Sequence, residues 1–538
     1  MRSRQARRRR SGLRSQVAFS ILCAIYLACA SAVAAGAAHV LHARSVAITP
    51  PAGRLVGPAP ATPKYLVLIV LDGARPDYFG LTSLPHVDAL RAAGTQYTNA
   101  FDGILESETP AGHTTIATGS RPNRNGILGF DWANSSGRYS LFSPDQMGTV
   151  VQLIQDAHAP TLASLYKKQY PQAKVVALSG HKYYAAAPLG GPAADAILYY
   201  QGDANGHYVP VAVPGHAPPA TMLNDPGLVY PSIHLPDGME DHLATRLALS
   251  AVSTMHPRML LINYPEFDWP LGHVDGGSLN RPKVITDMQG FDADLGKIED
   301  AYSRAGILNQ TLFVITADHG MMPITRFVQS SIVNNAVSQA GTSAPDIASS
   351  SADYVWLADP SKAQAVAQNV VKTHDPDIAS AYYLTTLNGK PEYAAAGGSS
   401  ISPGMETANQ YLLGALLNGH EPSVVVFGEE GASFSDPTSN WKADHGGNTW
   451  QSQQIPLILS GPGIAGGVTS SAPAQLDDVA PTVLTVMGVS PAGMEGHALA
   501  DALVQPPAST VTARNGEIQS LQPIVDALTA QENSSAPN

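Results

Sequence analysis

Three runs made up mostly of apolar residues occur along the chain, and each leads into a short segment that contains polar residues. The runs cover residues 65–71, 259–264 and 312–317. Such runs are typical of strands that are buried on both faces of a parallel sheet. The segments that follow them end in acids or contain Asp-His-Gly. Because open α/β sheets bind ligands beyond the carboxyl ends of their strands, these segments are predicted to share one site.

Amphipathic segments between the runs predict helices. Residues 161–168 open with an N-cap candidate, Thr161, and place apolar residues at helical spacing, and residues 286–305 show a similar pattern. Residues 454–460 predict a late strand, and residues 477–484 predict a last helix. The alternation of strands and helices predicts the α/β class, with a mostly parallel central sheet and helices on both of its faces.

The length of 538 residues suits one large α/β core with insertions. We expect a catalytic domain over residues 64–505. Stretches near 183–240 and 325–440 are irregular and polar, and we interpret them as lid insertions over the site. Residues 506–538 show no clear role in the core and are treated as a tail.

The N-terminus has the pattern of an export signal. Seven arginines precede or overlap an uncharged stretch, residues 15–40, that is rich in Ala, Leu, Val and Ile. Small-residue triplets near residue 35 suit cleavage, which predicts a signal peptide over residues 1–35 and a periplasmic or secreted protein. Residues 36–63, rich in Pro, Gly and Ala, are predicted to be a linker. The alternative is a retained membrane anchor, because about 20 apolar residues can span a bilayer.

Charge and cysteine content exclude several classes of function. The chain has 31 Lys and Arg against 43 Asp and Glu, and the predicted signal peptide would remove seven Arg and no acid. We therefore expect no binding of nucleic-acid polymers and no stable membrane partner unless the N-terminal segment is retained. Both cysteines, Cys23 and Cys29, lie in the predicted signal, so no thiolate serves as nucleophile or metal ligand. Bound metal cations would compensate the charge of an anionic substrate.

Six acidic and histidine residues stand after the predicted strands or in short polar motifs. Carboxylate and imidazole ligands without thiolate suit zinc in a catalytic role. Six ligands exceed the need of one four-coordinate ion and fit two ions with open positions. Two ions about 4 Å apart can clamp the attacking and leaving oxygens of a phosphoryl displacement. The six residues are Asp72, Asp268, His273, Asp318, His319 and His445.

Five short motifs occur in order between about Lys64 and Val489. They are LDGARPD at 71–77, TPAGHTTIATG at 109–119, Gly-His at 272–273, TADHGM at 316–321 and Asp-His-Gly at 444–446. Together they resemble the alkaline phosphatase superfamily, and most closely its nucleotide pyrophosphatase/phosphodiesterase (type I phosphodiesterase) branch. The resemblance implies an alkaline phosphatase-like fold for most of the chain.

The same resemblance implies roles for single residues. One zinc ion would be held by Asp72, Thr109, Asp318 and His319, and the second by Asp268, His273 and His445. Thr109 would be the nucleophile and would form a phospho-threonine intermediate, because coordination to zinc lowers the pKa of its hydroxyl. His113 is interpreted as a buried hydrogen-bonding residue that supports the Thr109 loop rather than as a ligand.

Two positions depart from the family's pattern near the expected ligands. The acid before the Gly-His pair stands five residues ahead of His273 instead of four, so Asp268 is the predicted ligand and Glu266 the alternative. We interpret Pro270 as marking a bulge that absorbs the extra residue. In the region where the family has an Asn that donates to a phosphoryl oxygen, this chain has Phe130 and Asp131. No residue is therefore assigned to that role.

A third departure concerns the Lys and Arg with which related monoesterases bind the phosphate dianion. His181 and Tyr183 stand at the matching positions, although Lys182 lies between them. Because a dianion needs such charge more than a diester monoanion does, the departure favours diesters. Phe130, Asp131, His181 and Tyr183 are the candidate substrate-binding residues. Aromatic rings among them, together with Tyr184, suit a nucleobase or an apolar leaving group.

The sequence thus predicts an exported phosphoester hydrolase that uses two Zn²⁺ ions. We expect a phosphodiesterase or nucleotide pyrophosphatase that acts on a nucleotide or another small diester. A broad-specificity phosphate monoesterase, an alkaline phosphatase, is the alternative on the same scaffold. An alternative of another class is a non-catalytic relative that binds metal or phosphate esters, against which the retained Thr109 and ligand set argue.

Overall fold

The computed structural model describes residues 61–134, 137–143, 146–398 and 401–535. The predicted signal peptide, and the predicted linker up to residue 60, lie outside the described residues. Within the described part of the chain, no helix combines the length and apolar character needed to cross a membrane.

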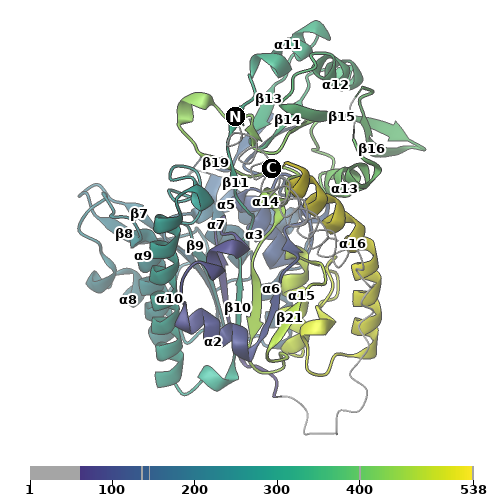
Figure 1. The fold of residues 1–538 in the computed structure, drawn as a ribbon. Helices are drawn as coiled ribbons and strands as arrows, with labels where there is room; N and C mark the ends of the chain where they lie inside the picture. Colours follow the sequence, from purple (N-terminus) through teal and green to yellow (C-terminus); the bar gives the residue numbers. More distant parts are fainter. Residues whose placement is uncertain (1–60, 135–136, 144–145, 399–400, 536–538) are drawn as a thin grey trace, which may run out of the picture. The chain divides into compact units, whose positions relative to one another are not determined.

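A nine-stranded sheet lies at the centre of the fold, in the order β21-β2-β20-β10-β1-β9-β6-β7-β8 (Figure 1). Its middle strands pair in parallel, and Ile69 lies opposite both Ile315 and Ile262. This confirms the predicted mostly parallel sheet. The parallel strands are β10 (Thr311–Thr316), β1 (Tyr65–Leu71), β9 (Met259–Tyr264), β6 (Val175–Ser179) and β7 (Ala196–Gly202).

The edge strands are mostly antiparallel. The predicted late strand is β20 (Leu457–Ser460), which runs antiparallel to β10 and to β2 (Thr95–Tyr97). On that side the sheet ends with β21 (Val468–Ser470), which pairs in parallel with β2. At the opposite edge β8 (Tyr208–Ala212) runs antiparallel to β7.

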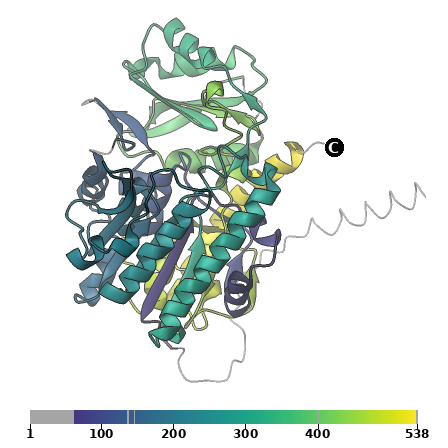
Figure 2. The same ribbon diagram turned by 90° about the vertical axis from the view of Figure 1, so that its left-hand side faces the viewer.

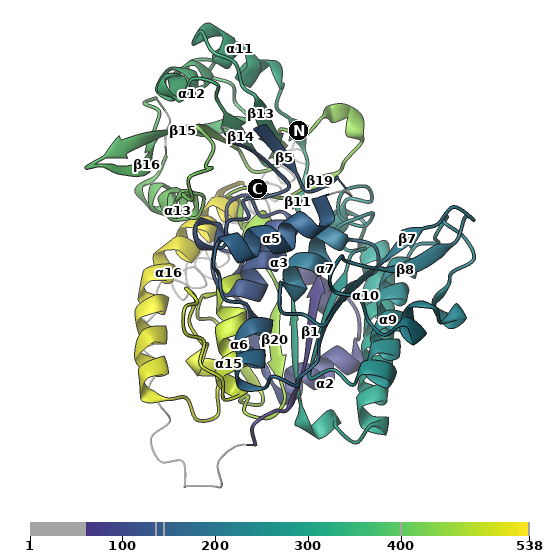
Figure 3. The same cartoon turned by 180° about the vertical axis from the view of Figure 1, so that it is seen from behind.

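Helices cover both faces of the sheet, which explains why its central strands are mostly apolar. One face packs against α2 (Pro85–Ala93), α9 (Met239–Met255) and α10 (Arg281–Arg304), and Figure 2 shows the two long teal helices α9 and α10 side by side. Figure 3 shows the other face. Its helices are α3 (Thr109–Thr118), α5 (Met147–Asp156), α6 (Leu162–Gln169), α7 (Tyr183–Gly190) and α15 (Val479–Val486).

The predicted N-cap of α6 is confirmed by its hydrogen bonds. Thr161 Oγ1 accepts from the backbone N–H of Ser164 at 3.0 Å, and Ser164 Oγ accepts from the backbone N–H of Thr161 at 2.8 Å. This reciprocal pair satisfies two N–H groups that the first helical turn leaves free.

The structure differs from the sequence interpretation over residues 183–240. Helix α7 and strand β7 in this range belong to the core, and residues 196–200 of β7 are fully or almost fully buried. Pro and Gly on both sides of these elements concealed a short apolar run. Only the later part of the range, with β8, α8 (Ala220–Leu223) and long loops, lies outside the parallel core.

Residues 325–440 contain a separate five-stranded antiparallel sheet, in the order β13-β14-β17-β15-β16. Its strands are β13 (Asp346–Ser349), β14 (Ala352–Trp356), β17 (Val424–Gly428), β15 (Ile378–Leu387) and β16 (Lys390–Ala395). Helices α11 (Ser331–Gln339) and α12 (Ala363–Val371) share one hydrophobic cluster with it, and α13 (Pro403–Gly414) contributes to another. The hydroxyl of Tyr354 lies 2.9 Å from the carbonyl oxygen of Leu105 and 2.7 Å from that of Gly446. The insertion therefore contacts two of the loops that carry the predicted site.

Most of the predicted tail is a packed helix, α16 (Ala508–Ser535). Leu521, Ile524 and Leu528 bury their side chains in a cluster with Phe101 and Trp450. The fully buried Arg514 also pairs with Asp501 at 3.0 Å and Glu517 at 2.7 Å. The sequence of α16 did not predict this packing, because its amphipathic pattern is weak. The helix contacts several different elements and not one apolar surface.

Candidate functional site

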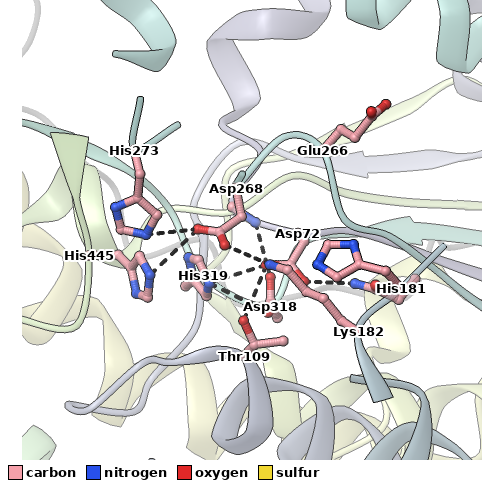
Figure 4. Close-up of polar contacts among 12 residues, drawn as sticks. Asp72, Thr109, His181, Lys182, Glu266, Asp268, His273, Asp318, His319 and His445 are labelled. Atoms are coloured by element: carbon pink, nitrogen blue, oxygen red, sulfur yellow. Dashed lines mark hydrogen bonds and ion pairs between the residues drawn. The ribbon is translucent and has the colours of Figure 1, made fainter. Parts of the chain in front are cut away.

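The predicted polar segments converge at the carboxyl ends of four neighbouring parallel strands. Asp72 follows β1, Asp268 lies in the loop after β9, and Asp318 lies beyond β10. Lys182 enters from the loop after β6 (Figure 4). Since β10, β1, β9 and β6 are adjacent in the sheet, their ends form a continuous edge.

Thr109 is the first residue of α3 and is only 1% exposed. Its Oγ1 lies 3.4 Å from Asp72 Oδ1. The helix N-terminus directs its free N–H groups and the positive end of its dipole toward the same place, which favours an anion there. Pro110 stands where the helix tolerates a missing N–H.

Three histidines present Nε2 to the cluster because their Nδ1 atoms are engaged by backbone carbonyls. Such a contact fixes the tautomer and leaves the Nε2 lone pair for a ligand. The pairs are His273 with Ala443 at 2.9 Å, His319 with Gly320 at 2.9 Å, and His445 with Ser107 at 2.8 Å.

The carboxylates face these ring nitrogens. Asp268 Oδ1 lies 3.2 Å from His273 Nε2 and 3.6 Å from His445 Nε2. His319 Nε2 lies 3.5 Å from oxygens of both Asp72 and Asp318, and the His319 ring stacks on that of His445 with centroids 3.7 Å apart. The structure thus brings all seven predicted metal ligands together, with His319 between the two expected groups.

The donor set fits metal cations. Asp268 Oδ1, Asp318 Oδ2 and His319 Nε2 are buried and make no hydrogen bond of good geometry with any described residue. Buried polar atoms of this kind need a partner. Oxygen and imidazole donors that converge with free lone pairs suit zinc or a similar divalent ion.

Charged groups in the cluster shift the pKa values of Asp268 and His319. Burial raises the pKa of Asp268, but Lys182 and His273 outweigh burial and hold this pKa well below its usual range. Burial lowers the pKa of His319, yet Asp318 and Asp72 outweigh it and raise the pKa to about 10. Without a cation, Asp268 is therefore ionised and His319 holds a proton, which an incoming metal ion must displace.

Lys182 is the residue of this site that the sequence analysis did not select. Its side chain is 2% exposed, and its Nζ lies 2.6 Å from Asp268 Oδ2 and 3.0 Å from Asp72 Oδ1 (Figure 4). Its backbone N–H donates to Ser179 Oγ, which fixes the start of α7. The buried ammonium therefore lies between the two expected groups of ligands.

The neighbours of Lys182, predicted to bind substrate, face other groups. His181 Nδ1 lies 2.6 Å from Glu240 Oε2, and the Tyr183 hydroxyl donates to the carbonyl oxygen of Leu141 at 2.5 Å. Neither side chain joins the seven-residue cluster. The residue of this loop that brings a charge to the cluster is Lys182, which lies between the two predicted residues.

The other two predicted substrate-binding residues lie beside the cluster rather than in it. The Phe130 ring stacks on Phe142 with centroids 3.7 Å apart and meets the edge of Tyr184 at 4.9 Å. Burial raises the pKa of the Tyr184 hydroxyl, and the charge of nearby Lys182 acts in the opposite direction. Phe130 therefore belongs to an aromatic wall near the site. Asp131 instead pairs with Arg138 at 3.1 Å.

His113 has partners at both ring nitrogens, in line with the supporting role expected for it. Nδ1 lies 2.8 Å from the carbonyl oxygen of Thr109, and Nε2 lies 3.1 Å from Asn263 Nδ2. The same amide nitrogen of Asn263 donates to Asp72 Oδ2 at 2.8 Å. Asn263, the penultimate residue of β9, thereby links His113 to Asp72; it carried no motif that could have identified it.

Asp268, and not the alternative Glu266, faces the histidines. Figure 4 shows the Glu266 side chain directed away from the cluster, and its Oε1 accepts from the backbone N–H of Glu240 at 3.3 Å. The extra residue before His273 is absorbed in turns after β9, where the backbone N–H of His273 donates to the carbonyl oxygen of Asp268. This segment is not paired in a sheet, so Pro270 does not mark a β-bulge.

Gly112 sets how closely α3, the helix that begins at Thr109, approaches Asp318. A Cβ at Gly112 would stand 2.6 Å from the Asp318 carbonyl oxygen. We expect Gly112→Ala to cost about 1–3 kcal/mol of unfolding free energy and to lower kcat/KM about tenfold or more through displacement of reacting groups. Urea unfolding and steady-state kinetics measure both effects.

Gly290 provides the matched control for Gly112, because it lies inside α10 and a Cβ added there would meet no described atom within 4 Å. Gly290→Ala should gain about 0.5–1 kcal/mol from helix propensity and leave kinetics unchanged. Equal behaviour of the two variants would refute the close-contact role of Gly112.

Comparison with known sequences identifies relatives of the chain. The model of the family described as type I phosphodiesterase / nucleotide pyrophosphatase matches residues 66–447. Alkaline phosphatase PhoK of Sphingomonas sp is 28% identical over 173 residues, which cover 30% of this chain and 29% of that protein. Alkaline phosphatase PhoD of Zymomonas mobilis is 28% identical over 120 residues, or 21% of each chain. The chain thus matches less than a third of the length of either curated relative.

Solved structures share the fold. Wild-type alkaline phosphatase PafA superposes with a TM-score of 0.63 at 15% identity, covering 83% of this chain and 100% of that chain. Murine ectonucleotide pyrophosphatase / phosphodiesterase 5 gives 0.56 at 13% identity, covering 82% and 100%. The family match over most of the chain shows that the protein belongs to the type I phosphodiesterase / nucleotide pyrophosphatase family.

Proposed function

We propose that this protein is a zinc-dependent phosphodiesterase that uses Thr109 as its nucleophile. The observation that supports this most directly is the position of the Thr109 hydroxyl. It lies at a helix N-terminus, 3.4 Å from Asp72, beside the converging carboxylates and histidine Nε2 atoms. A nucleophile, an anion-binding helix end and candidate metal ligands therefore occupy one buried edge of the sheet.

Two zinc ions would be held by two adjoining sets of residues. Zinc bound there would lower the pKa of the nucleophilic hydroxyl and offset the charge of the phosphate. The first set is Asp72, Thr109, Asp318 and His319, and the second is Asp268, His273 and His445. The rings of His319 and His445 stack with centroids 3.7 Å apart, which supports two adjoining sets.

The reaction would proceed in two displacements. Thr109 Oγ1 forms a bond to phosphorus while the bond from phosphorus to the leaving-group oxygen breaks, which yields phospho-threonine and an alcohol. Water then attacks phosphorus, which releases a phosphate monoester and restores the hydroxyl of Thr109. His113 positions the nucleophile through its contact with the Thr109 carbonyl oxygen.

The surroundings of the site favour a diester with an apolar or aromatic group. Lys182 is the one buried ammonium that reaches the ligand carboxylates among the described residues, and Tyr184 beside it is uncharged. One ammonium matches a diester monoanion. The aromatic wall of Phe130, Phe142 and Tyr184 suits a ring such as a nucleobase. The related murine ectonucleotide pyrophosphatase / phosphodiesterase 5 has been crystallised in complex with AMP, a nucleotide.

A phosphate monoesterase is the second candidate, and Lys182 is the observation that favours it. An ammonium beside the nucleophile can pair with the extra charge of a monoester dianion. The two candidates differ in how much the reaction depends on this charge.

Paired rates on a bis-aryl and a mono-aryl phosphate would test the proposal. We expect the zinc-loaded wild type to prefer the diester in kcat/KM. Lys182→Gln should lower the monoester rate at least about tenfold more than the diester rate, as expected for a lost charge-assisted contact. His181→Gln is the matched control and should change both rates less than about twofold. A monoester preference of the wild type would replace the diester proposal with the monoesterase.

Export is a proposal that the sequence alone supports, through the basic and apolar pattern of residues 1–35. Expression in a Gram-negative host with separation of periplasm and membranes should place activity in the periplasm. N-terminal sequencing of that fraction should begin near residue 36. Activity that remains with membranes would instead indicate a retained anchor.

A further inference from the structure

A second group of carboxylates lies beside the proposed catalytic site but shares no residue with its ligand set. Glu108 is the N-cap residue of α3, directly before Thr109. Asp131 begins β4 (Asp131–Asn134), and Asp346 begins β13 of the inserted sheet. These three side chains approach one another from separate parts of the chain.

Glu106 points into this group and supplies an independent indication of a ligand. Its side chain is 1% exposed, and neither of its carboxylate oxygens makes a hydrogen bond with any described residue. Burial raises the pKa of Glu106 well above its usual range, and the charges of Glu108, Asp131 and Asp346 raise it further. A buried carboxyl that faces only like charges and no donor requires a partner.

Gly129 leaves room for two of these carboxylates to meet. A Cβ at this position would stand 2.6 Å from Glu106 Oε1 and 2.7 Å from Glu108 Oε2. Glu108 Oε2 also accepts from the backbone N–H of Phe130 at 2.6 Å, which holds it in place. Only a residue without a side chain fits between these oxygens.

Arg138 is the cation that reaches the group within the described part of the chain, and it acts from the solvent side. Its side chain is 54% exposed and lies 3.1 Å from Asp131 Oδ2 and 2.9 Å from Asp346 Oδ1. The second oxygens, Asp131 Oδ1 and Asp346 Oδ2, are buried and have no hydrogen-bond partner among the described residues. The guanidinium thus pairs with two of the four carboxyl groups, and the second oxygens of those two remain without a partner among the described residues.

We propose that Glu106, Glu108, Asp131 and Asp346 bind a divalent cation of the calcium and magnesium class. The donors are all oxygens, which such hard cations prefer, whereas the proposed zinc ligands include imidazoles. Calcium suits carboxyl groups that come from several segments, since it accepts irregular shells of six to eight oxygens that include water.

A cation at this position would connect three segments of the fold. Through Glu108 it would hold the residue next to the nucleophile, and through Asp346 it would join the inserted sheet to that loop. It would therefore stabilise the start of α3, and it takes no part in the transfer of the phosphoryl group.

Calcium titration of the zinc-saturated protein tests the proposal. Calorimetry should show a calcium site in the wild type, and calcium should raise the Tm, because a ligand that binds only the folded state stabilises it. Glu106→Gln keeps the shape and removes the charge; it should weaken calcium binding at least about tenfold and abolish the Tm shift. Magnesium is titrated in parallel, and a site specific for either cation supports the proposal.

Two further variants make the test specific. Asp346→Asn should also weaken binding and serves if Glu106→Gln does not fold. Glu430→Gln is the matched control, because Glu430 is likewise a carboxyl with no hydrogen-bond partner among the described residues but lies outside the group. It should bind calcium as the wild type does. Thr109→Ala should bind calcium normally too, so failure of the catalytic proposal would not affect this result.

Two outcomes would overturn the proposal. One is calcium binding of unchanged affinity in both Glu106→Gln and Asp346→Asn. The other is a wild type that binds neither calcium nor magnesium while Glu106→Gln raises its Tm without added cation, which would mean that the carboxyl groups share protons instead.

Discussion

Replacement of Thr109 by alanine is expected to lower kcat/KM for phosphate esters by about 10⁴-fold or more, because the residue that accepts the phosphoryl group is lost. The substitution removes a hydroxyl that is 1% exposed and leaves the carboxylates and histidines in place. Substrate binding should therefore survive, and the loss should appear in kcat. Steady-state kinetics and a binding titration with a product nucleotide measure the two effects.

Two variants accompany Thr109→Ala. Thr109→Ser keeps a hydroxyl and should keep measurable turnover. Thr114→Ala removes another buried hydroxyl of α3, one that donates to the carbonyl oxygen of Pro110 at 2.6 Å, and should change kcat/KM only slightly. Acid quenching during turnover of a diester should trap on Thr109 the phosphoryl group with its remaining ester substituent. Full activity of Thr109→Ala would show that water attacks the substrate directly.

Removal of the metal ions is the second change with a large expected effect. Chelation should abolish turnover and lower the Tm, and added zinc should restore both. At free zinc about 1,000 times its dissociation constant, each site that is absent from the unfolded chain contributes about 4 kcal/mol of unfolding free energy. Part of this stabilisation comes from relief of the charge of Asp72, Asp268 and Asp318, which Lys182 alone offsets only partly.

The zinc affinity should also depend on pH in a definite direction. Without a cation the pKa of His319 is about 10, so this ring is protonated at neutral pH and zinc must displace the proton. The apparent affinity should therefore fall as the pH falls and rise as the pH approaches that value. Calorimetry in buffers of different ionisation enthalpy would count the released protons.

His445→Ala provides the control for the metal assignment, since it should retain less zinc by atomic emission than His497→Ala. His497 pairs with Glu517 near α16 and lies outside the cluster. Turnover that survives thorough chelation, or equal zinc content in the two variants, would refute the assignment.

The sequence by itself determined the central strands and the place of the site. The runs at 65–71, 259–264 and 312–317 are mostly apolar because helices cover both faces of β1, β9 and β10. Burial of a strand on both faces can therefore be predicted from the residues of that strand alone. Parallel strands bring their carboxyl ends to one edge, so Asp72, Asp268 and Asp318 were expected together before any contact was known. The motif resemblance added Thr109 and divided the predicted ligands into two sets.

Only the tertiary structure decided which neighbouring side chain enters the site. Of His181, Lys182 and Tyr183, Lys182 reaches Asp72 and Asp268, because the start of α7 is set by a hydrogen bond to Ser179. The choice of Asp268 over Glu266 depends in the same way on turns after β9.

The packing of helix α16 and the cluster of carboxyl groups around Glu106 also depend on contacts between segments hundreds of residues apart. Arg514 finds its partners only when α16 lies against the core, and Asp346 meets Glu106 only when the inserted sheet packs beside α3. The order of apolar and polar residues along a segment indicates how deeply the segment is buried and with what period its buried positions recur. The direction of a single side chain, and the charges that it meets, follow from the packing of distant segments, which no local pattern contains.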